Sequence, residues 1–475
     1  MKTFELSESI DNKKVFIIQS SQLEGRLDVD FYKPEILALE YKVRSKASGK
    51  LSKYIAKIAS GSTPSKTEEH RYYTTSELGI PFLRVQNLGV NGEISFTGLK
   101  YINEETHKGL LKRSQVSGGD LLVKITGVGR MAIASVAPEN FVANTNQHMV
   151  VIKPKNISSK YLAQYLNLDL VEKLASRRST GGTRPALDYP ALKSIPIIEN
   201  IDFSKLNDAY LKQKRILKEA NEKLASIDAY LLDKLGVEHE QKKINVESRI
   251  FTMPFRNLVG KRFDPIYYNS DLDQFNKGKF TSTKLKTLIK AFSSGQGVGR
   301  QDQVSEDEGI LQIRPTNLGP QGSFLFQKNI FVPDEARHKR LQKGDVIFNN
   351  TNSQELVGKS AYWDVDLEAT YSNHITVLRV DEIKIFPEYL ALILNLYQKS
   401  NIFYSICTNW NNQSGVGIDV LLDLNIPLPP LALQEEIISH IRQIRDEAKK
   451  LKDEANLVLE NAKQEIERII LGETE

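Results

Sequence analysis

Cysteine is nearly absent from this 475-residue sequence, in which Cys407 stands alone. One cysteine cannot form an intramolecular disulfide, so a disulfide-stapled secreted fold is excluded. The sequence also has no apolar run close to the roughly 18 residues that a membrane-spanning helix needs. Its first residues, MKTFELSESIDNKK, lack the apolar stretch of a signal peptide. We therefore expect a cytoplasmic protein.

The motifs of the common enzyme classes are missing as well. We find no Gly-x-Gly-x-x-Gly or P-loop pattern, no Asn-Pro-Pro-aromatic motif of adenine methyltransferases and no His-x-x-x-His pair for zinc. The GVGR segments at 127–130 and 297–300 are too short to indicate nucleotide binding. His148 and His374 precede apolar runs, which favours structural roles for both. We expect no catalytic residue, no metal site and no cofactor bound by this chain.

Neither sign of charge dominates, because 64 Lys and Arg residues against 59 Asp and Glu residues leave a formal net charge of +5. A mildly basic protein is compatible with nucleic acid as a partner but does not require it. The hydrophobic content of 40% is that of a globular protein. The length suggests roughly two to four domains.

What the sequence does contain is an internal repeat. Residues 80–89, IPFLRVQNLG, are matched by residues 310–319, ILQIRPTNLG. Further matches follow in the same order at a nearly constant separation: Arg26-Leu27-Asp28 with Arg262-Phe263-Asp264, 50–61 with 284–295, Gly119-Asp120 with Gly344-Asp345, His148 with His374, and 161–168 with 389–396. Collinear matches of this kind predict two copies of one domain.

Each copy is predicted to be a mixed α/β (α+β) domain. Short β-rich runs follow the two Gly-Asp pairs, and the apolar runs after the paired histidines predict further strands. The segments 161–168 and 389–396 have helical spacing. Each copy closes with an Ile-Pro pair, Ile195-Pro196 or Ile426-Pro427, which should end regular structure just before a long helix.

Two long helices with heptad spacing are expected after the repeats. We expect globular domains at 1–200 and 238–430, and helices at 201–237 and 431–475. Matching apolar seams favour an antiparallel coiled coil that acts as a spacer, because the second domain returns the chain; the alternative is that each helix lies on its own domain. The expected seam residues are Leu217, Leu224, Ile227, Leu231, Ile437, Ile441, Ile444, Leu451 and Val458.

The predicted loops are rich in the side chains that read DNA. Arg pairs with guanine and Asn or Gln with adenine, while Ser, Thr and Lys contact phosphates. Such loops occur at different compositions in the two copies, although for any single residue a merely solvated side chain is the alternative. The loops are 61–76 and 179–185 in the first copy, and 295–303, 349–354 and 409–415 in the second.

The run IPLPPLALQEEI at 426–437, together with the two repeats and two heptad helices, resembles the specificity subunit of type I restriction-modification enzymes. The resemblance covers essentially the whole chain. The first copy departs from the pattern, because Ile195-Pro196 continues without a Pro-Pro pair or a Gln-Glu-Glu sequence. That departure weakens any residue-level comparison there but does not affect the architecture.

The resemblance implies two target-recognition domains, each of which reads one half of a bipartite, asymmetric site in double-stranded DNA. The two helices would set the spacing and dock two methyltransferase (modification) subunits. Two ATP-dependent translocase-nuclease (restriction) subunits would join for restriction. S-adenosylmethionine, ATP and Mg would belong to these partner subunits, which would explain the missing catalytic motifs.

Within the repeated stretch, Ile80, Leu83 and Leu88 and their counterparts Ile310, Ile313 and Leu318 should be core. Arg84 and Arg314 occur in both copies, which argues against base reading and leaves a phosphate or an internal carboxylate as partner. Base readers should differ between copies. Our candidates are Lys66, Arg71, Tyr72, Thr183 and Arg184 in the first domain, and Gln296, Arg300, Gln301, Asn350, Asn352, Asn411 and Gln413 in the second.

Two other classes of protein remain open at this point. One is a nuclease or methyltransferase of unfamiliar sequence that carries its own DNA readers, which predicts turnover by the purified chain. The other is a coiled-coil adaptor that binds protein or carbohydrate, which predicts no salt-dependent affinity for DNA.

Overall fold

The computed structural model describes residues 11, 14–238, 250–259, 263–268, 272–335, 337–410 and 413–473. The chain forms two compact units. The first unit comprises Met1–Leu217 and Asp453–Glu475, and the second comprises Lys218–Lys452. Each unit therefore contains a globular part and a segment of both long helices.

A four-stranded antiparallel sheet forms the centre of the first unit, in the order β2 (Ile55–Ser60), β10 (Met149–Pro154), β7 (Leu121–Lys124) and β8 (Ala134–Val136). Side chains of a strand alternate between the two faces of a sheet. Accordingly Leu121 and Val123 pack with helices α4 (Ser159–Leu166) and α5 (Asp169–Arg178), whereas Leu122 belongs to a second core. The apolar run after the Gly-Asp turn is thus a strand buried on both faces.

The second unit repeats this sheet in the same order: β13 (Ile289–Ser294), β20 (Ile375–Val380), β16 (Val346–Asn349) and β18 (Ser360–Tyr362). Its strands also divide their side chains between two cores, with Val346 and Phe348 in one and Ile347 in the other. Helices α10 (Pro387–Lys399) and α11 (Ile402–Ile406) contribute to the first of these cores. The predicted repeat of a mixed helix and sheet domain is confirmed.

Each unit has a second sheet that contains one parallel pair. In the first unit the order is β3 (Tyr73–Thr74), β5 (Lys100–Ile102), β4 (Ile80–Leu83), β9 (Ala143–Thr145) and β6 (Gln115–Val116), with β4 and β9 parallel. In the second unit the order is β15 (Phe331–Pro333), β14 (Gly309–Ile313) and β19 (Ala369–Tyr371), with β14 and β19 parallel.

Shorter elements complete the two units. The first has α1 (Pro34–Lys46), α2 (Glu69–Tyr72), α3 (Glu104–Lys108), α6 (Tyr189–Lys193) and the pair β1 (Gly49–Lys50) with β11 (Pro196–Ile197). The second has α8 (Pro265–Tyr268), α9 (Leu272–Phe275), α12 (Ile418–Leu422), the pair β12 (Ser282–Lys284) with β23 (Asn425–Pro427), and the sheet β17 (Thr351–Asn352), β22 (Gln413–Gly415) and β21 (Thr408–Trp410).

The repeated polar residues are buried and hydrogen-bond to backbone. Asn87 is 0% exposed, its Oδ1 accepts the Arg84 N–H at 3.0 Å and its Nδ2 donates to the Ser95 carbonyl at 2.9 Å. Asn317 is 1% exposed and makes the same two bonds, from the Arg314 N–H and to a later carbonyl, at 3.0 Å each. Buried backbone groups need such partners. The Asn-Leu-Gly repeat is therefore a shared turn.

The core predicted for that stretch is largely confirmed. Leu83, Leu88, Ile310, Ile313 and Leu318 are at most 8% exposed. Ile80 is partly buried instead, and it packs against a small cluster formed by Phe82, Ile102 and Leu111.

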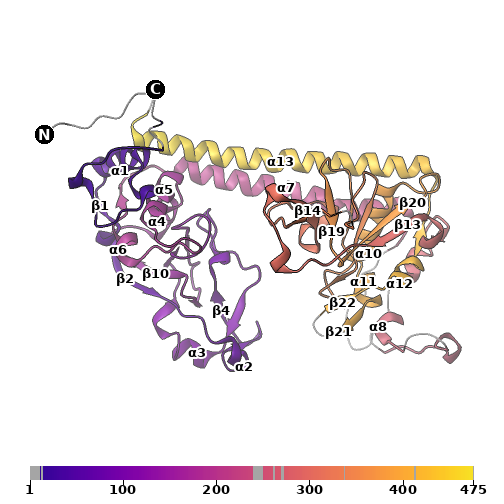
Figure 1. Ribbon diagram of the computed structural model, residues 1–475. Helices are drawn as coiled ribbons and strands as arrows, with labels where there is room; N and C mark the ends of the chain where they lie inside the picture. Colours follow the sequence, from indigo (N-terminus) through magenta and orange to yellow (C-terminus); the bar gives the residue numbers. More distant parts are fainter. Residues whose placement is uncertain are drawn as a thin grey trace. The chain divides into compact units, whose positions relative to one another are not determined.

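Helices α7 (Ser204–Leu235) and α13 (Leu431–Leu471) run antiparallel within each unit (Figure 1). The ion pairs Lys205–Glu465 and Lys212–Glu454 join them in the first unit, and Lys223–Glu447 and Lys234–Glu436 in the second. Among the expected seam residues, Ile227, Leu231, Ile437 and Ile441 are buried, while Leu217, Leu224, Ile444, Leu451 and Val458 are partly buried.

The alternative, in which each long helix lies on its own domain, also holds in part. Ile227 and Ile437 belong to the same core cluster as the α10 side chains, and Ile466 belongs to the core of the first unit. Each helix thus packs against both its partner and the adjoining globular part. The sequence pattern missed Ile216, which is 6% exposed. No helix in the described part of the chain is long and apolar enough to cross a membrane.

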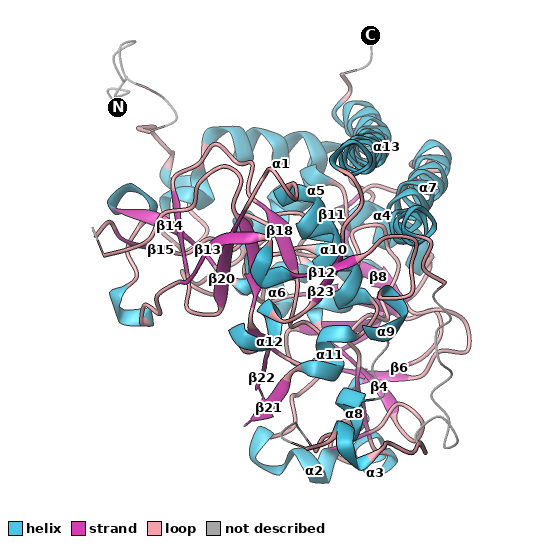
Figure 2. Cartoon of the chain, turned by 90° about the vertical axis from the view of Figure 1, so that its right-hand side faces the viewer, coloured by secondary structure: helices cyan, strands magenta, loops and turns pink. Residues whose placement is uncertain are grey.

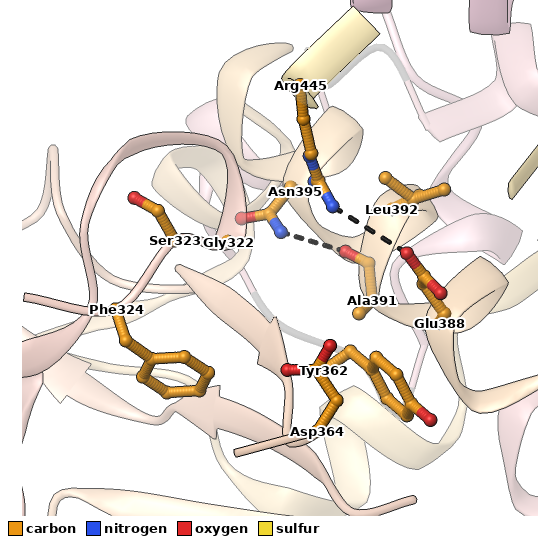
Figure 3. Close-up of a pocket in the computed structure, with 10 residues that line it drawn as sticks. All are labelled: Gly322, Ser323, Phe324, Tyr362, Asp364, Glu388, Ala391, Leu392, Asn395 and Arg445. Carbon is orange, nitrogen blue, oxygen red and sulfur yellow. Dashed lines mark hydrogen bonds and ion pairs between the residues drawn. The ribbon is translucent and has the colours of Figure 1, made fainter. Parts of the chain in front are cut away.

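A small pocket of about 230 Å³ marks the place where α13 meets the second globular part (Figure 3). Glu388 of α10 is 6% exposed there and pairs with Arg442 and with Arg445 of α13. The Arg445 Nη2 also donates to the Gln321 carbonyl at 2.6 Å, and the Gln321 Nε2 donates to the Leu224 carbonyl of α7 at 2.7 Å. These contacts attach both helices to the globular part of the second unit.

Candidate nucleic-acid interface

The candidate loops of the first unit start from one edge of its central sheet. Strand β2 ends at Ser60 opposite Val150, and β7 ends at Lys124 opposite Met149, so the segments that follow Ser60 and Lys124 leave the sheet beside His148. Gly61 begins the first segment and lies against β9, because a Cβ at this position would come within 1.7 Å of the Thr145 carbonyl oxygen. We call this end of the sheet, where the loops leave the strands, the edge of the first unit.

A hairpin made by residues 180–186 adds to the edge of the first unit. Thr180 and Ala186 exchange backbone hydrogen bonds of 2.8 and 2.7 Å, and Ala186 also bridges to Thr126 in the segment after β7. The candidates Thr183 and Arg184 lie in its turn and are exposed. The structure thus joins the loop 179–185 to a second loop that starts after β7.

The edge of the second unit is built in the same way. Strand β13 ends at Ser294 opposite Thr376, and β16 ends at Asn349 opposite Ile375. Gly295 begins the loop after β13, and a Cβ at this position would come within 2.1 Å of the carbonyl oxygen of Tyr371, the last residue of β19. Gly61 and Gly295 therefore fix the two loops at equivalent places.

The second edge brings together candidates from three separate loops. Asn350 follows β16, and its N–H donates to the His374 carbonyl at 3.1 Å. Asn352 lies in β17, which pairs with β22, where Gln413 is found. Gln296 follows Gly295, and its N–H donates to the Tyr371 carbonyl at 3.1 Å. Arg300 and Gln301 are exposed in the same loop. Asn411 lies outside the described residues.

The two hairpins occupy equivalent positions. In the first unit Thr180 and Thr126 pair with Ala186, and in the second Thr408 and Thr351 pair with Gly415. Hairpin β21–β22 lies on the side of the second unit away from its segment of α13 (Figures 1 and 2). The two units thus share one backbone frame, made of the sheet, the glycine and the hairpin, but their exposed side chains differ.

Arg84 and Arg314 follow β4 and β14 directly, beside β9 and β19, the strands against which Gly61 and Gly295 lie. The Arg84 Nη2 donates to the Gly98 carbonyl at 2.7 Å, and the Arg314 Nε donates to the Gln312 Oε1 at 2.9 Å. Among the described residues neither guanidinium forms an ion pair with a carboxylate. Burial lowers the pKa of Arg314 below its ordinary value. Of the two partners expected from the sequence, the internal carboxylate is thus not found within the described ranges.

Arg71 and Tyr72 are placed in α2 and are not brought to the hairpin by any contact between described residues. The Arg71 guanidinium lies 3.6 Å from the Glu68 carboxylate, and the Tyr72 hydroxyl donates to the same carboxylate at 3.1 Å. Both are surface side chains in a local cluster. The Lys66 side chain is outside what the structure describes.

Two cationic or titratable groups lie beneath the first edge. Lys124 is 3% exposed, its Nζ donates to the Val128 carbonyl at 2.8 Å, and burial lowers its pKa. Burial, and to a lesser degree the positive charge of Arg184, lowers the pKa of His148. His148 is thus a partly buried neighbour of the hairpin. Within the described ranges, no group of three or more His, Cys, Asp or Glu side chains could hold a metal ion.

Sequence reasoning missed two exposed apolar residues at the edges. Val128 is 77% exposed between two glycines of the loop after β7, and Trp410 is 48% exposed in hairpin β21–β22. Trp410 stands in the loop 409–415, which the composition had marked as polar, and Val128 stands in the GVGR segment at 127–130. An aromatic residue inside an otherwise polar loop is the signal that would have identified Trp410.

The family model for the type I restriction modification DNA specificity domain matches residues 50–199 and 321–461, more than half of the chain. The chain belongs to this family. The two matches fall one in each repeat, and they include the hairpin 180–186 and hairpin β21–β22.

Two relatives of known family align with part of the chain. One is assigned as the specificity subunit of the type I restriction enzyme MjaX of Methanocaldococcus jannaschii, with 36% identity over 144 residues, which is 30% of this chain and 31% of that protein. The other is the EcoKI specificity subunit of Escherichia coli, with 28% identity over 137 residues, which is 28% of each chain. The alignments thus span about a third of each relative's length.

Solved structures of type I restriction-modification S subunits align over most of their length. The S subunit from M. genitalium gives a TM-score of 0.33 at 13% identity, over 88% of this chain and 94% of that one. The HsdS subunit from Thermoanaerobacter tengcongensis gives 0.32 at 14% identity, over 89% and 94%. These TM-scores are low, and the family assignment rests on the matched family model instead.

Proposed function

We propose that the chain is the DNA-recognition subunit of a type I restriction-modification enzyme. Each unit would read one half of a bipartite, asymmetric sequence in double-stranded DNA. The observation that carries this proposal is the pair of equivalent sheet edges, which share Gly61 or Gly295 and a hairpin but display different donors and acceptors. Two copies of one frame with different exposed side chains suit two different half-sites.

The side chains divide into two groups by what they can do. The side chains exposed at the edges suit base edges, because arginine offers paired donors and glutamine offers a donor with an acceptor: Arg184, Arg300, Gln301 and Gln413. Arg84 and Arg314 occupy the same place in both copies and have no carboxylate partner among the described residues. They are suited to phosphate, which is the same in every sequence.

The partners follow from the family. Helices α7 and α13 would set the distance between the half-sites and dock two methyltransferase subunits, and two translocase-nuclease subunits would join for restriction. S-adenosylmethionine, ATP and Mg would be bound by those subunits. The chain itself would perform no chemistry.

The proposal is tested by methylation in a host that lacks other modification systems. The chain is co-expressed with the methyltransferase subunit encoded beside it, and methylated adenines are mapped by single-molecule sequencing. A new bipartite motif that depends on this chain is the expected result. The methyltransferase subunit expressed alone is the control, and a soluble complex that produces no motif would contradict the proposal.

Two further measurements separate the rival functions. The purified chain, given DNA with S-adenosylmethionine or Mg²⁺, should neither methylate nor cleave it, whereas an enzyme with its own readers would. Affinity for duplex DNA should fall by orders of magnitude as salt rises, because phosphate contacts release counterions. An adaptor that does not bind DNA would show no such dependence.

A further inference from the structure

Trp410 is one of two tryptophans in the chain, and it lies at the edge of the second unit. Trp363 is 1% exposed and packs edge to face on Phe324, with ring centroids 5.0 Å apart. Trp410 is 48% exposed in a hairpin whose other members are polar or glycine. A large aromatic side chain left half in water needs a reason other than the core.

The hairpin holds the indole in one place. A Cβ on Gly415 would come within 2.5 Å of the Trp410 Cη2 and 3.3 Å of its Cζ3, so the outer edge of the six-membered ring lies directly over that glycine. Gly415 has no unusual backbone conformation that would itself require glycine, because it is absent from the residues with positive φ. Space for the indole is therefore a reason for glycine at this position.

Strand pairing places Trp410 on the same face as one of the base-reading candidates. Trp410 is directly opposite Gln413, and Thr408 is opposite Gly415, so these four share one face of the hairpin. Asn409 and Ser414 point to the other face, where the Ser414 hydroxyl donates to the Asn409 Oδ1 at 2.6 Å. The first face thus combines a half-exposed aromatic ring with the exposed amide of Gln413.

We propose that Trp410, held over Gly415, is a specificity-determining residue that contacts the apolar surface of a base in the half-site read by the second unit. This inference rests on the proposed function. The apolar surface is either a thymine methyl group in the major groove or the face of a base that has left the stack, as the target of an adenine methyltransferase must. The hairpin of the first unit, residues 180–186, carries no aromatic residue, so this contact belongs to one half-site.

The test uses the full chain in complex with its methyltransferase subunit and duplexes that contain the mapped motif. Trp410→Ala should weaken binding to the motif about tenfold, in line with the cost of losing one base–aromatic contact. It should also relax discrimination in the second half-site and leave the first half-site unchanged. Trp410→Phe should restore most of the affinity. Phe326→Ala, which removes an aromatic that is 37% exposed elsewhere in the second unit, is the matched control.

Gly415→Ala tests the position of the indole without removing it. It should reproduce the loss seen for Trp410→Ala, and the double variant should lose no more than either alone. Gly415→Ala and the double variant must unfold at the same temperature as wild type before their affinities are compared. If Gly415→Ala does not fold, Trp410→Phe is compared with Trp410→Ala instead. Specific DNA should quench the fluorescence of the wild type but not that of Trp410→Phe, whose remaining Trp363 is buried.

Modified DNA identifies the surface that is contacted. Replacement of thymine by uracil removes one methyl group, and 2-aminopurine reports a base that has left the stack. One of these probes should respond in wild type and not in Trp410→Ala. If wild type binds its motif but Trp410→Ala keeps the affinity and discrimination within twofold, the inference is wrong and the proposed function stands. If wild type binds no motif at all, the proposed function itself fails.

Discussion

The hairpin of residues 180–186 in the first unit and hairpin β21–β22 in the second stand at the same point of two sheets with the same strand order. The first displays Thr183 and Arg184, and the second displays Trp410 and Gln413. Around both, the repeated residues are buried: Asn87 and Asn317 form the same backbone bonds in the two units. What the units share supports the fold, and what differs is exposed at the edges.

Another matching pair shows how the frame is fixed. Asn167 bonds both the N–H and the carbonyl of Ala134 in β8, at 3.0 and 2.7 Å. Asn395 bonds both groups of Ser360 in β18, at 3.1 and 2.6 Å. Each asparagine ties the edge strand of the central sheet to the helix that covers it. The exposed residues can therefore change without loss of these bonds.

Removal of the shared glycines should have the largest effect on either unit. Gly61→Ala and Gly295→Ala each place a methyl carbon far inside the van der Waals contact distance from a backbone oxygen, at 1.7 and 2.1 Å. We expect each to lower the free energy of unfolding of its own unit by at least about 3 kcal/mol. Denaturant unfolding followed by circular dichroism measures this.

Gly417→Ala is the matched control for these variants, since nothing lies within 4 Å of its Cβ position and its φ is −63°. It should unfold like wild type. Equal stability of Gly295→Ala and Gly417→Ala would show that the loop after β13 does not depend on the close approach to β19.

The attachment of α13 differs between the units and offers a second test. In the second unit Glu388 is 6% exposed and faces both Arg442 and Arg445. Glu388→Ala should lower the stability of that unit by about 2–3 kcal/mol, because it leaves the guanidinium of Arg445 without its carboxylate partner. Thermal unfolding measures this loss of stability as a lower melting temperature. Asp366→Ala removes an ion pair with a 97% exposed carboxylate and should change little, so equal shifts would rule out a special role for Glu388.

The difference between the edges is tested most directly with Arg184 and Arg300. If each guanidinium is bidentate to guanine, Arg184→Ala should cost about 1–2 kcal/mol and relax one position of the first half-site. Arg300→Ala should do the same in the second half-site only. Competition binding with every single-base variant of the motif measures both. Arg84→Ala, which removes a phosphate candidate, should weaken all sequences alike, and a base-specific effect there would reverse the assignment.

The sequence predicted the repeat, the mixed domains and the two helices because these depend on local periodicity and on collinear matches. It also identified 179–185, 349–354 and 409–415 as candidate loops. It did not reveal that the last two form one sheet, because the pairing of β17 with β22 joins residues about sixty positions apart. The loop sequence shows Trp410 as an aromatic residue among polar ones, but it does not show what the ring contacts. Only the opposite strand shows that Gly415 makes room for the ring.

The smallest expected effect concerns how α13 joins the first unit. The Glu467 Oε1 accepts the Leu170 N–H at 3.0 Å, and burial raises the pKa of this carboxyl, with the negative charge of Asp169 adding to the rise. A raised pKa means that the folded state penalises the charged form. This penalty is present above the folded pKa, and it disappears as the pH falls toward the ordinary value of 4.5.

Glu467→Gln removes that penalty and still offers an oxygen to the Leu170 N–H. The variant should therefore be as stable as wild type or slightly more stable near neutral pH, and the difference should shrink as the pH is lowered. Denaturant unfolding of the first unit at several pH values measures how the difference in the free energy of unfolding changes with pH. Glu460→Gln, at an exposed position of the same helix, is the control. A variant that is less stable at neutral pH would mean that the charge of Glu467 holds α13 in place. The attachment in the first unit would then be ionic, like that of Glu388 in the second.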